Sequence, residues 1–65
     1  MLHKEGDKVK VKIPQFKKIY GGVNEWVIDF IKTQTKGYPS LYVCYNVNDP
    51  HKLLFQFLEK DVEKI

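Results

Sequence analysis

The chain has 65 residues, which suits one small domain and leaves no room for a second. Its 43% hydrophobic and 14% aromatic residues exclude a disordered chain, and its single cysteine, Cys44, excludes a disulfide scaffold. Eleven lysines and eight acids give a net charge of +3 without any arginine, which argues against a sequence-specific DNA reader because arginine is the usual bidentate partner of guanine.

The N-terminal segment, residues 1–5, has no apolar periodicity and is expected to be a loose tail, with the domain spanning residues 6–65. No signal-like stretch follows Met1, and no apolar run approaches the roughly 20 residues that a membrane helix needs. We therefore expect a cytoplasmic protein without membrane contact.

Residues 8–13 follow the turn signal Gly6-Asp7 and alternate lysine with a β-branched residue. This period of two predicts a strand with one core face and one solvent face, and Pro14 ends it. The core face comprises Val9, Val11 and Ile13, and the solvent face comprises Lys8, Lys10 and Lys12.

Residues 15–23 are expected to form a loop, with Gly21-Gly22 as a breaker pair. The loop carries Phe16, Ile19 and Tyr20 beside Lys17 and Lys18.

Two later segments favour strands, although each admits a helix. Residues 25–33 are rich in β-branched and aromatic residues, which favours a strand. A helix is the alternative, with Asn24 as its N-cap and Gly37 at its C-terminal end. Residues 53–57 favour a strand, followed by a 3₁₀ turn over 58–61 and a final strand over 62–65. The alternative is a β-α-β-α fold, with helices near 24–36 and 50–64.

Residues 41–47 predict a strand between these two segments. The side chains of Leu41, Val43, Tyr45 and Val47 share one face of it, which is apolar. We expect four residues on the apolar faces of their strands to be buried, namely Trp26, Ile28, Val43 and Phe57.

The order of these signals resembles the SH3-like barrels of small docking subunits and KOW-type domains. "GDKVKVKIP" resembles their first strand, "QFKKIYGG" their long first loop, "WVIDFIK" and "YPSLYVCYNV" strands two and three, and "LFQFLEKDVEKI" strand four, the 3₁₀ turn and strand five. The layout is similar to the small SH3-like docking protein of photosystem I and to the variable chain of ferredoxin–thioredoxin reductase. The resemblance implies an all-β, five-stranded SH3-like barrel that acts as a docking module.

Residues with catalytic or metal-binding chemistry do not form recognisable motifs. Ser40, Asp49 and His51 are the ingredients of a hydrolase triad but lack a nucleophile-elbow motif, and His3, Cys44 and His51 lack zinc-ligand spacing. We expect no enzyme activity, no cofactor and no metal.

A partner-binding surface is the favoured functional hypothesis. Lysines on one strand face and in the first loop would attract an acidic protein, and nearby aromatic side chains would supply affinity, unless they fold inward to close the barrel. The alternatives are non-specific nucleic-acid binding through the same side chains, and a small phage or mobile-element inhibitor of a host enzyme. The candidate residues are Lys8, Lys10, Lys12, Phe16, Lys17, Lys18, Tyr20 and Tyr38.

Overall fold

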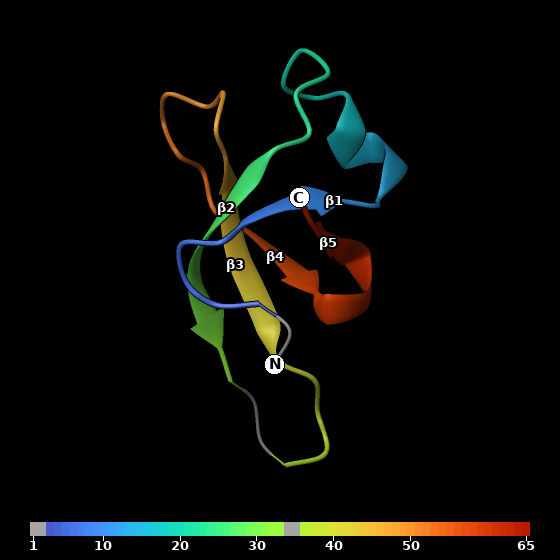
Figure 1. Cartoon of the computed structure of the whole chain (residues 1–65), viewed down its shortest axis with the longest axis vertical. Coiled ribbons are helices and arrows are strands. Elements are labelled where there is room, and N and C mark those ends of the chain that lie inside the picture. The colour runs from blue at the N-terminus through green and yellow to red at the C-terminus, as the bar shows by residue number, and fades with distance from the viewer. Residues whose placement is uncertain (1–2, 34–35) are drawn as a thin grey trace.

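The computed structural model describes residues 3–33 and 36–65, which form an all-β fold (Figure 1). Within these ranges there are five strands and two 3₁₀ turns, and no α-helix. The all-β prediction is confirmed, together with the 3₁₀ turn before the last strand, whereas the helical alternative is wrong. The elements are β1 (Lys8–Val11), η1 (Pro14–Lys17), β2 (Trp26–Lys32), β3 (Leu41–Asn46), β4 (Phe55–Leu58), η2 (Glu59–Asp61) and β5 (Val62–Lys64).

The five strands form one antiparallel sheet in the order β4-β3-β2-β1-β5. This arrangement is compatible with a small barrel-like fold, but the sheet is not closed, because β4 and β5 are its two end strands. The sheet stays open because of the connection between β4 and β5. The 3₁₀ turn η2 redirects the chain so that β5 pairs with β1, and no ladder among the described residues joins β5 to β4.

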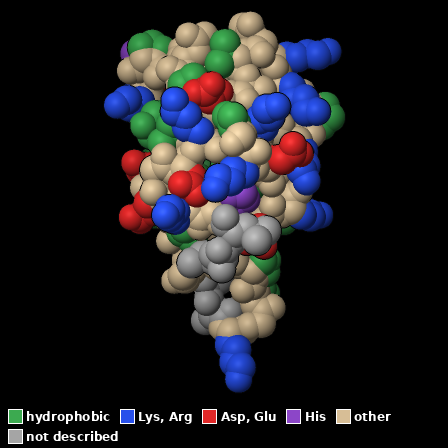
Figure 2. Space-filling view, in the orientation of Figure 1, with side chains coloured by type: hydrophobic (Ala, Val, Ile, Leu, Met, Phe, Trp, Pro, Cys, Tyr) green, Lys and Arg blue, Asp and Glu red, His purple; other side chains and the backbone are tan. Residues whose placement is uncertain are grey.

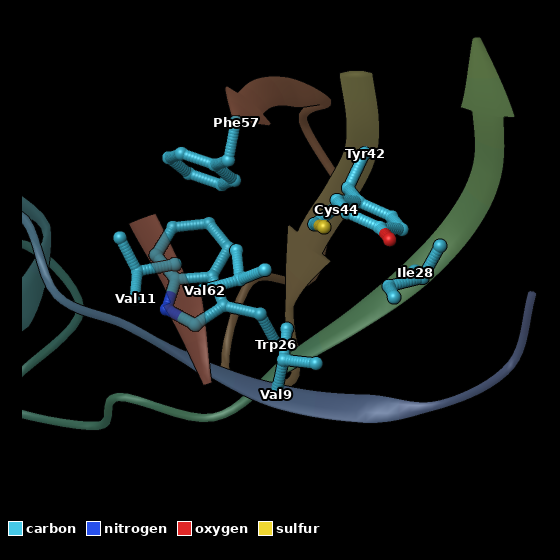
Figure 3. Packing of buried hydrophobic residues seen from close by; sticks show 8 residues of the cluster. All are labelled: Val9, Val11, Trp26, Ile28, Tyr42, Cys44, Phe57 and Val62. Carbon is cyan, nitrogen blue, oxygen red and sulfur yellow. The ribbon is translucent and has the colours of Figure 1, made fainter. Parts of the chain in front are cut away.

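The core lies on the concave side of this sheet, where side chains from all five strands meet (Figure 3). Val9 and Val11 are fully buried, as predicted for the core face of this strand, and Ile13, beyond the end of β1, is half-buried against the core. Trp26, at the start of β2, is also fully buried and lies at the centre of an aromatic cluster. The buried cluster comprises Val9, Val11, Trp26, Ile28, Tyr42, Cys44, Phe57 and Val62.

The orientation of β3 differs from the sequence-based expectation. Tyr42 lies opposite the core residue Phe57, and Cys44 lies opposite the core residue Ile28. Since successive side chains of a strand point to opposite faces, Val43 lies on the outer face of the sheet. It is buried as predicted, but outside the main core cluster.

A β-bulge in β2 helps to cover this outer face. The register shifts between Ile28 and Phe30, so that Phe30 lies opposite Val43 and Ile31 lies opposite Tyr42. A bulge adds one residue to one strand and bends it. Phe30 consequently lies on the outer face, where 40% of it is exposed, while Ile31 packs against the core.

Two asparagines replace backbone partners at the ends of strands. Asn24 accepts a hydrogen bond from the Val11 N–H at 3.0 Å and donates one to the Val11 carbonyl at 3.0 Å, so its side chain continues the pairing of β1. Asn46 is fully buried; its amide donates to the Val23 carbonyl at 2.8 Å and accepts from the Asn48 N–H at 2.8 Å. These bonds compensate the cost of burying polar groups.

The N-terminal segment expected to be a loose tail contains one buried residue. His3 is buried and packs edge-on against the Tyr42 ring, with ring centroids 5.2 Å apart. Residues 1–2 of that segment lie outside the described residues. The division of the chain into a tail and a domain therefore stays a prediction, although His3 belongs to the packed part of the molecule.

Candidate docking surface

The aromatic residues of the first loop point into the molecule. Phe16 makes edge-to-face contacts with Trp26, Phe55 and Phe57 at centroid distances of 5.9, 5.3 and 5.1 Å. Tyr20 contacts Trp26 in the same way at 5.7 Å. Of the two interpretations that the sequence left open, the inward one describes these two side chains, which cover the end of the core instead of forming an aromatic surface.

Tyr38 is separated from these two aromatic residues. It lies in the connection between β2 and β3, and 68% of it is exposed. The three aromatic candidates predicted from the sequence therefore do not form one patch.

A single carboxylate fastens the first loop to the loop between β3 and β4. The hydroxyl of Tyr20 donates to Asp49 Oδ2 at 2.8 Å. Asp49 also accepts from the backbone N–H groups of His51 at 2.9 Å and Leu53 at 3.0 Å. Asp49 thereby shapes its own loop and ties it to the first loop.

These contacts shift the pKa values of Asp49 and Tyr20. Burial by itself raises the pKa of Asp49, but the hydrogen bonds from His51, Tyr20 and Leu53 and the charge of His51 outweigh it, so the pKa lies below its ordinary value. Burial, followed by the bond to Asp49, raises the pKa of Tyr20. At neutral pH the carboxylate is charged and the phenol is protonated, which is the state that the hydrogen bond requires.

We call the surface formed by residues 14–24 and 47–54 the loop end. Figure 1 shows both loops at the same end of the molecule. Besides the bond between Tyr20 and Asp49, the Asn48 side chain donates to the Tyr20 carbonyl at 3.4 Å. The two loops therefore form one continuous surface.

The loop end combines exposed aliphatic side chains with positive charge. Its only acid, Asp49, is buried and hydrogen-bonded to Tyr20, His51 and Leu53, and no described ion pair links it to the lysines of this surface. In Figure 2, hydrophobic side chains and a lysine are visible at this upper end. The exposed aliphatic residues are Ile19 (51%), Val47 (43%), Leu53 (57%) and Leu54 (50%), and the lysines are Lys17, Lys18 and Lys52.

The lysine face of β1 is exposed as expected, but acids lie close to it. The Nζ atom of Lys8 is 3.3 Å from Glu25 Oε2. Lys10 lies directly opposite Glu63 of β5, a position at which opposite charges attract. Of the lysines predicted to bind a partner, Lys17 and Lys18 therefore lie beside exposed apolar surface, while Lys8 and Lys10 have acidic neighbours.

The described residues include neither a hydrogen-bonded triad nor a metal-ligand cluster. The described hydrogen bonds of the Asp49 carboxylate come from Tyr20 and two backbone N–H groups, and none comes from the His51 ring. Burial raises the pKa of Cys44 to about 12, which keeps the thiol protonated and unreactive. Residues 3–33 and 36–65 contain no cluster of potential metal ligands and no pocket.

Sequence reasoning missed the second half of the loop end. The sequence pattern identifies Asp49 only as one ingredient of a triad and places Leu53 at the start of a predicted strand, whereas Leu53 lies before β4 and is 57% exposed. The available signal is the Asp-Pro pair before two leucines, because Asp side chains accept hydrogen bonds from the backbone two residues on.

No helix in the described ranges is long and apolar enough to span a membrane. Comparison of the chain with protein-family models, with curated proteins and with solved structures finds no match.

Proposed function

We propose that the protein is a small, non-catalytic binding module of the SH3-like docking type, which binds an acidic protein partner through the loop end. One observation carries the proposal: half-exposed aliphatic side chains lie beside three lysines on a surface whose only acid is buried. A surface of this kind matches the usual anatomy of an interface, with an apolar centre and a polar rim.

The two kinds of side chain have different roles in this proposal. Leu53 and Ile19 lose water on binding and determine how long the complex lasts. Lys17 and Lys18 attract the acidic partner and determine how often it arrives. The bond between Tyr20 and Asp49 holds the two loops in place before binding, which reduces the entropy lost when the partner binds.

Nucleic acid is the less favoured ligand. Binding of single strands without sequence preference relies on aromatic side chains that stack on bases. Phe16 and Tyr20, the aromatic residues beside Lys17 and Lys18, pack against Trp26 instead. The lysines by themselves would bind phosphates only weakly and in a strongly salt-dependent manner.

The experiment measures association and dissociation rates of the full chain with a protein that it retains from its source cells, in parallel with a single-stranded oligonucleotide. Lys17→Glu should slow association with the protein about tenfold and reduce its salt dependence. Leu53→Ser should speed dissociation about tenfold while leaving association nearly unchanged.

Each variant has a matched control. Lys10→Glu reverses a charge on the β1 face, and Ile65→Ser truncates a residue whose exposure (56%) is close to that of Leu53. If the controls alter the rates as much as the loop-end variants do, the contact surface lies elsewhere. Tight, salt-sensitive binding of the oligonucleotide would favour the nucleic-acid alternative.

A further inference from the structure

The two end strands of the sheet differ in how well they are protected from other chains. An end strand exposes unpaired N–H and C=O groups, and natural proteins usually protect it with charges. The end strand β5 carries Glu63 and Lys64. The end strand β4 has the sequence Phe-Gln-Phe-Leu, and Leu53 and Leu54 before it extend the uncharged run to six residues.

We infer that the free edge of β4 pairs with β4 of a second copy of this chain, in antiparallel orientation about a two-fold axis at Gln56. This interaction goes beyond the proposed docking function and is centred on β4, and it overlaps the loop end only at Leu53 and Leu54.

The sequence of β4 is complementary to itself in this register. Around an axis at Gln56, Phe55 faces Phe57 of the second copy, and Leu54 faces Leu58. Each pair joins residues an even number of positions apart, so core-facing residues meet core-facing residues and outer residues meet outer residues. In the structure, Gln56 and Leu58 lie on the outer face, opposite Val43 and Leu41.

The pairing also accounts for an exposed apolar side chain beside the strand. Leu54 is 50% exposed immediately before β4 and continues its outer face. In the dimer, Leu58 of the second copy would cover it. Aliphatic pairs directly opposite each other across strands stabilise such pairing.

Charge favours this edge over the others. Each copy has a net charge of +3, so two copies repel unless they meet at an uncharged surface. The segment 53–58 has no charged residue. The lysine-rich strand β1 lies three strands away in the sheet. A second copy can therefore approach β4 with less repulsion than at β5 or β1.

The contact is small, because β4 has four residues, and interfaces that bury less than about 1,200 Å² belong to weak associations. The first test therefore traps the dimer covalently. In an antiparallel pair about Gln56, the two Cα atoms at position 56 lie roughly 4.5–5.5 Å apart, within the range for a disulfide. Under mild oxidation, Gln56→Cys should form a covalent dimer at least about tenfold faster than Glu63→Cys on the other end strand.

The parent chain provides the background for this test, since Cys44 is buried and should not cross-link. The second test is sedimentation equilibrium of the unmodified chain, in which the average mass should rise with concentration. Gln56→Lys and Gln56→Glu should both abolish the rise, because each places two like charges at the axis. Lys10→Gln should leave it unchanged.

Gln56 is exposed, so these variants should remain folded, which circular dichroism would verify. Equal cross-linking rates for Gln56→Cys and Glu63→Cys would overturn the inference. A constant monomer mass up to about 1 mM chain would also overturn it. Lys17→Glu tests the docking proposal and lies in η1, outside the edge of β4, so it should not change the mass and the two proposals can fail independently.

Discussion

The strands β1 and β3 are both inner strands of the same sheet, yet their two faces are organised differently. In β1, valines face the core and lysines face water. In β3, apolar residues occupy both faces, and the concave side takes Tyr42, Cys44 and Asn46. The comparison shows that the alternation of residues along a strand predicts the buried face in β1, where the other face is charged. It does not do so in β3, where both faces are apolar.

Polar groups at the two ends of β3 decide its orientation. The Tyr42 hydroxyl donates to Glu59 Oε1 at 2.8 Å, and the Asn46 amide bonds to Val23 and Asn48. With the opposite orientation, these groups would lose their partners. Since an unpaired buried polar group costs roughly 1–3 kcal/mol, such bonds can outweigh a small difference in apolar burial.

The largest effect is expected on the core face of β1. Val11→Ala should lower the free energy of unfolding by about 2–3 kcal/mol, because the lost burial of two methyl groups is increased by the cavity that remains. Val11 is fully buried among core side chains. Urea unfolding would measure the change, and a loss below about 1 kcal/mol would show that the site collapses around the smaller side chain.

A change at the end of β3 tests whether polar groups fix its orientation. Asn46→Leu should destabilise the fold by about 2 kcal/mol even though it adds apolar surface to a buried site, because the Val23 carbonyl and the Asn48 N–H lose their partner. Thermal unfolding would detect it. A variant as stable as the parent would show that hydrophobic burial alone orients the strand.

The same truncation on the outer face of β3 should have a smaller effect. Val43→Ala should cost about 1 kcal/mol, because its cross-strand neighbours Phe30 and Gln56 are exposed side chains that can move to fill the space. Val43 is only 3% exposed, so exposure by itself would predict the same loss as for Val11. Equal losses for the two valines in urea unfolding would contradict the assignment of faces.

The Asp49 carboxylate in the turn after β3 should make the stability of the fold depend on pH. Since the pKa of folded Asp49 lies below its ordinary value, the carboxylate contributes stability above about pH 4, and this contribution is lost as the pH falls through the folded pKa. Asp49→Asn keeps the shape and one acceptor oxygen, so it should be mildly destabilising at pH 7 and should flatten the stability profile below about pH 4. Thermal unfolding of the parent and of Asp49→Asn from pH 2 to 7 would measure this difference. Equal pH dependence of stability in the two proteins would contradict the prediction.

The smallest effect is expected on the charged face of β1. Lys10→Gln should change the free energy of unfolding by less than about 0.5 kcal/mol, because the side chain is exposed and its attraction to Glu63 is screened by water. A larger loss that disappears in high salt would reveal a stronger ion pair across β1 and β5.

The sequence by itself favoured the all-β class over a helical alternative, and it predicted the approximate places of the five strands and the core residues Val9, Val11, Trp26 and Phe57. It did so because lysine–valine alternation and runs of β-branched and aromatic residues are local signals. Only the tertiary structure decided which face of β3 is buried and that the sheet stays open. It also decided that Phe16 and Tyr20 point inward and that Asp49 joins two loops 29 residues apart in sequence. Those outcomes depend on partners distant in sequence, which a local pattern does not encode.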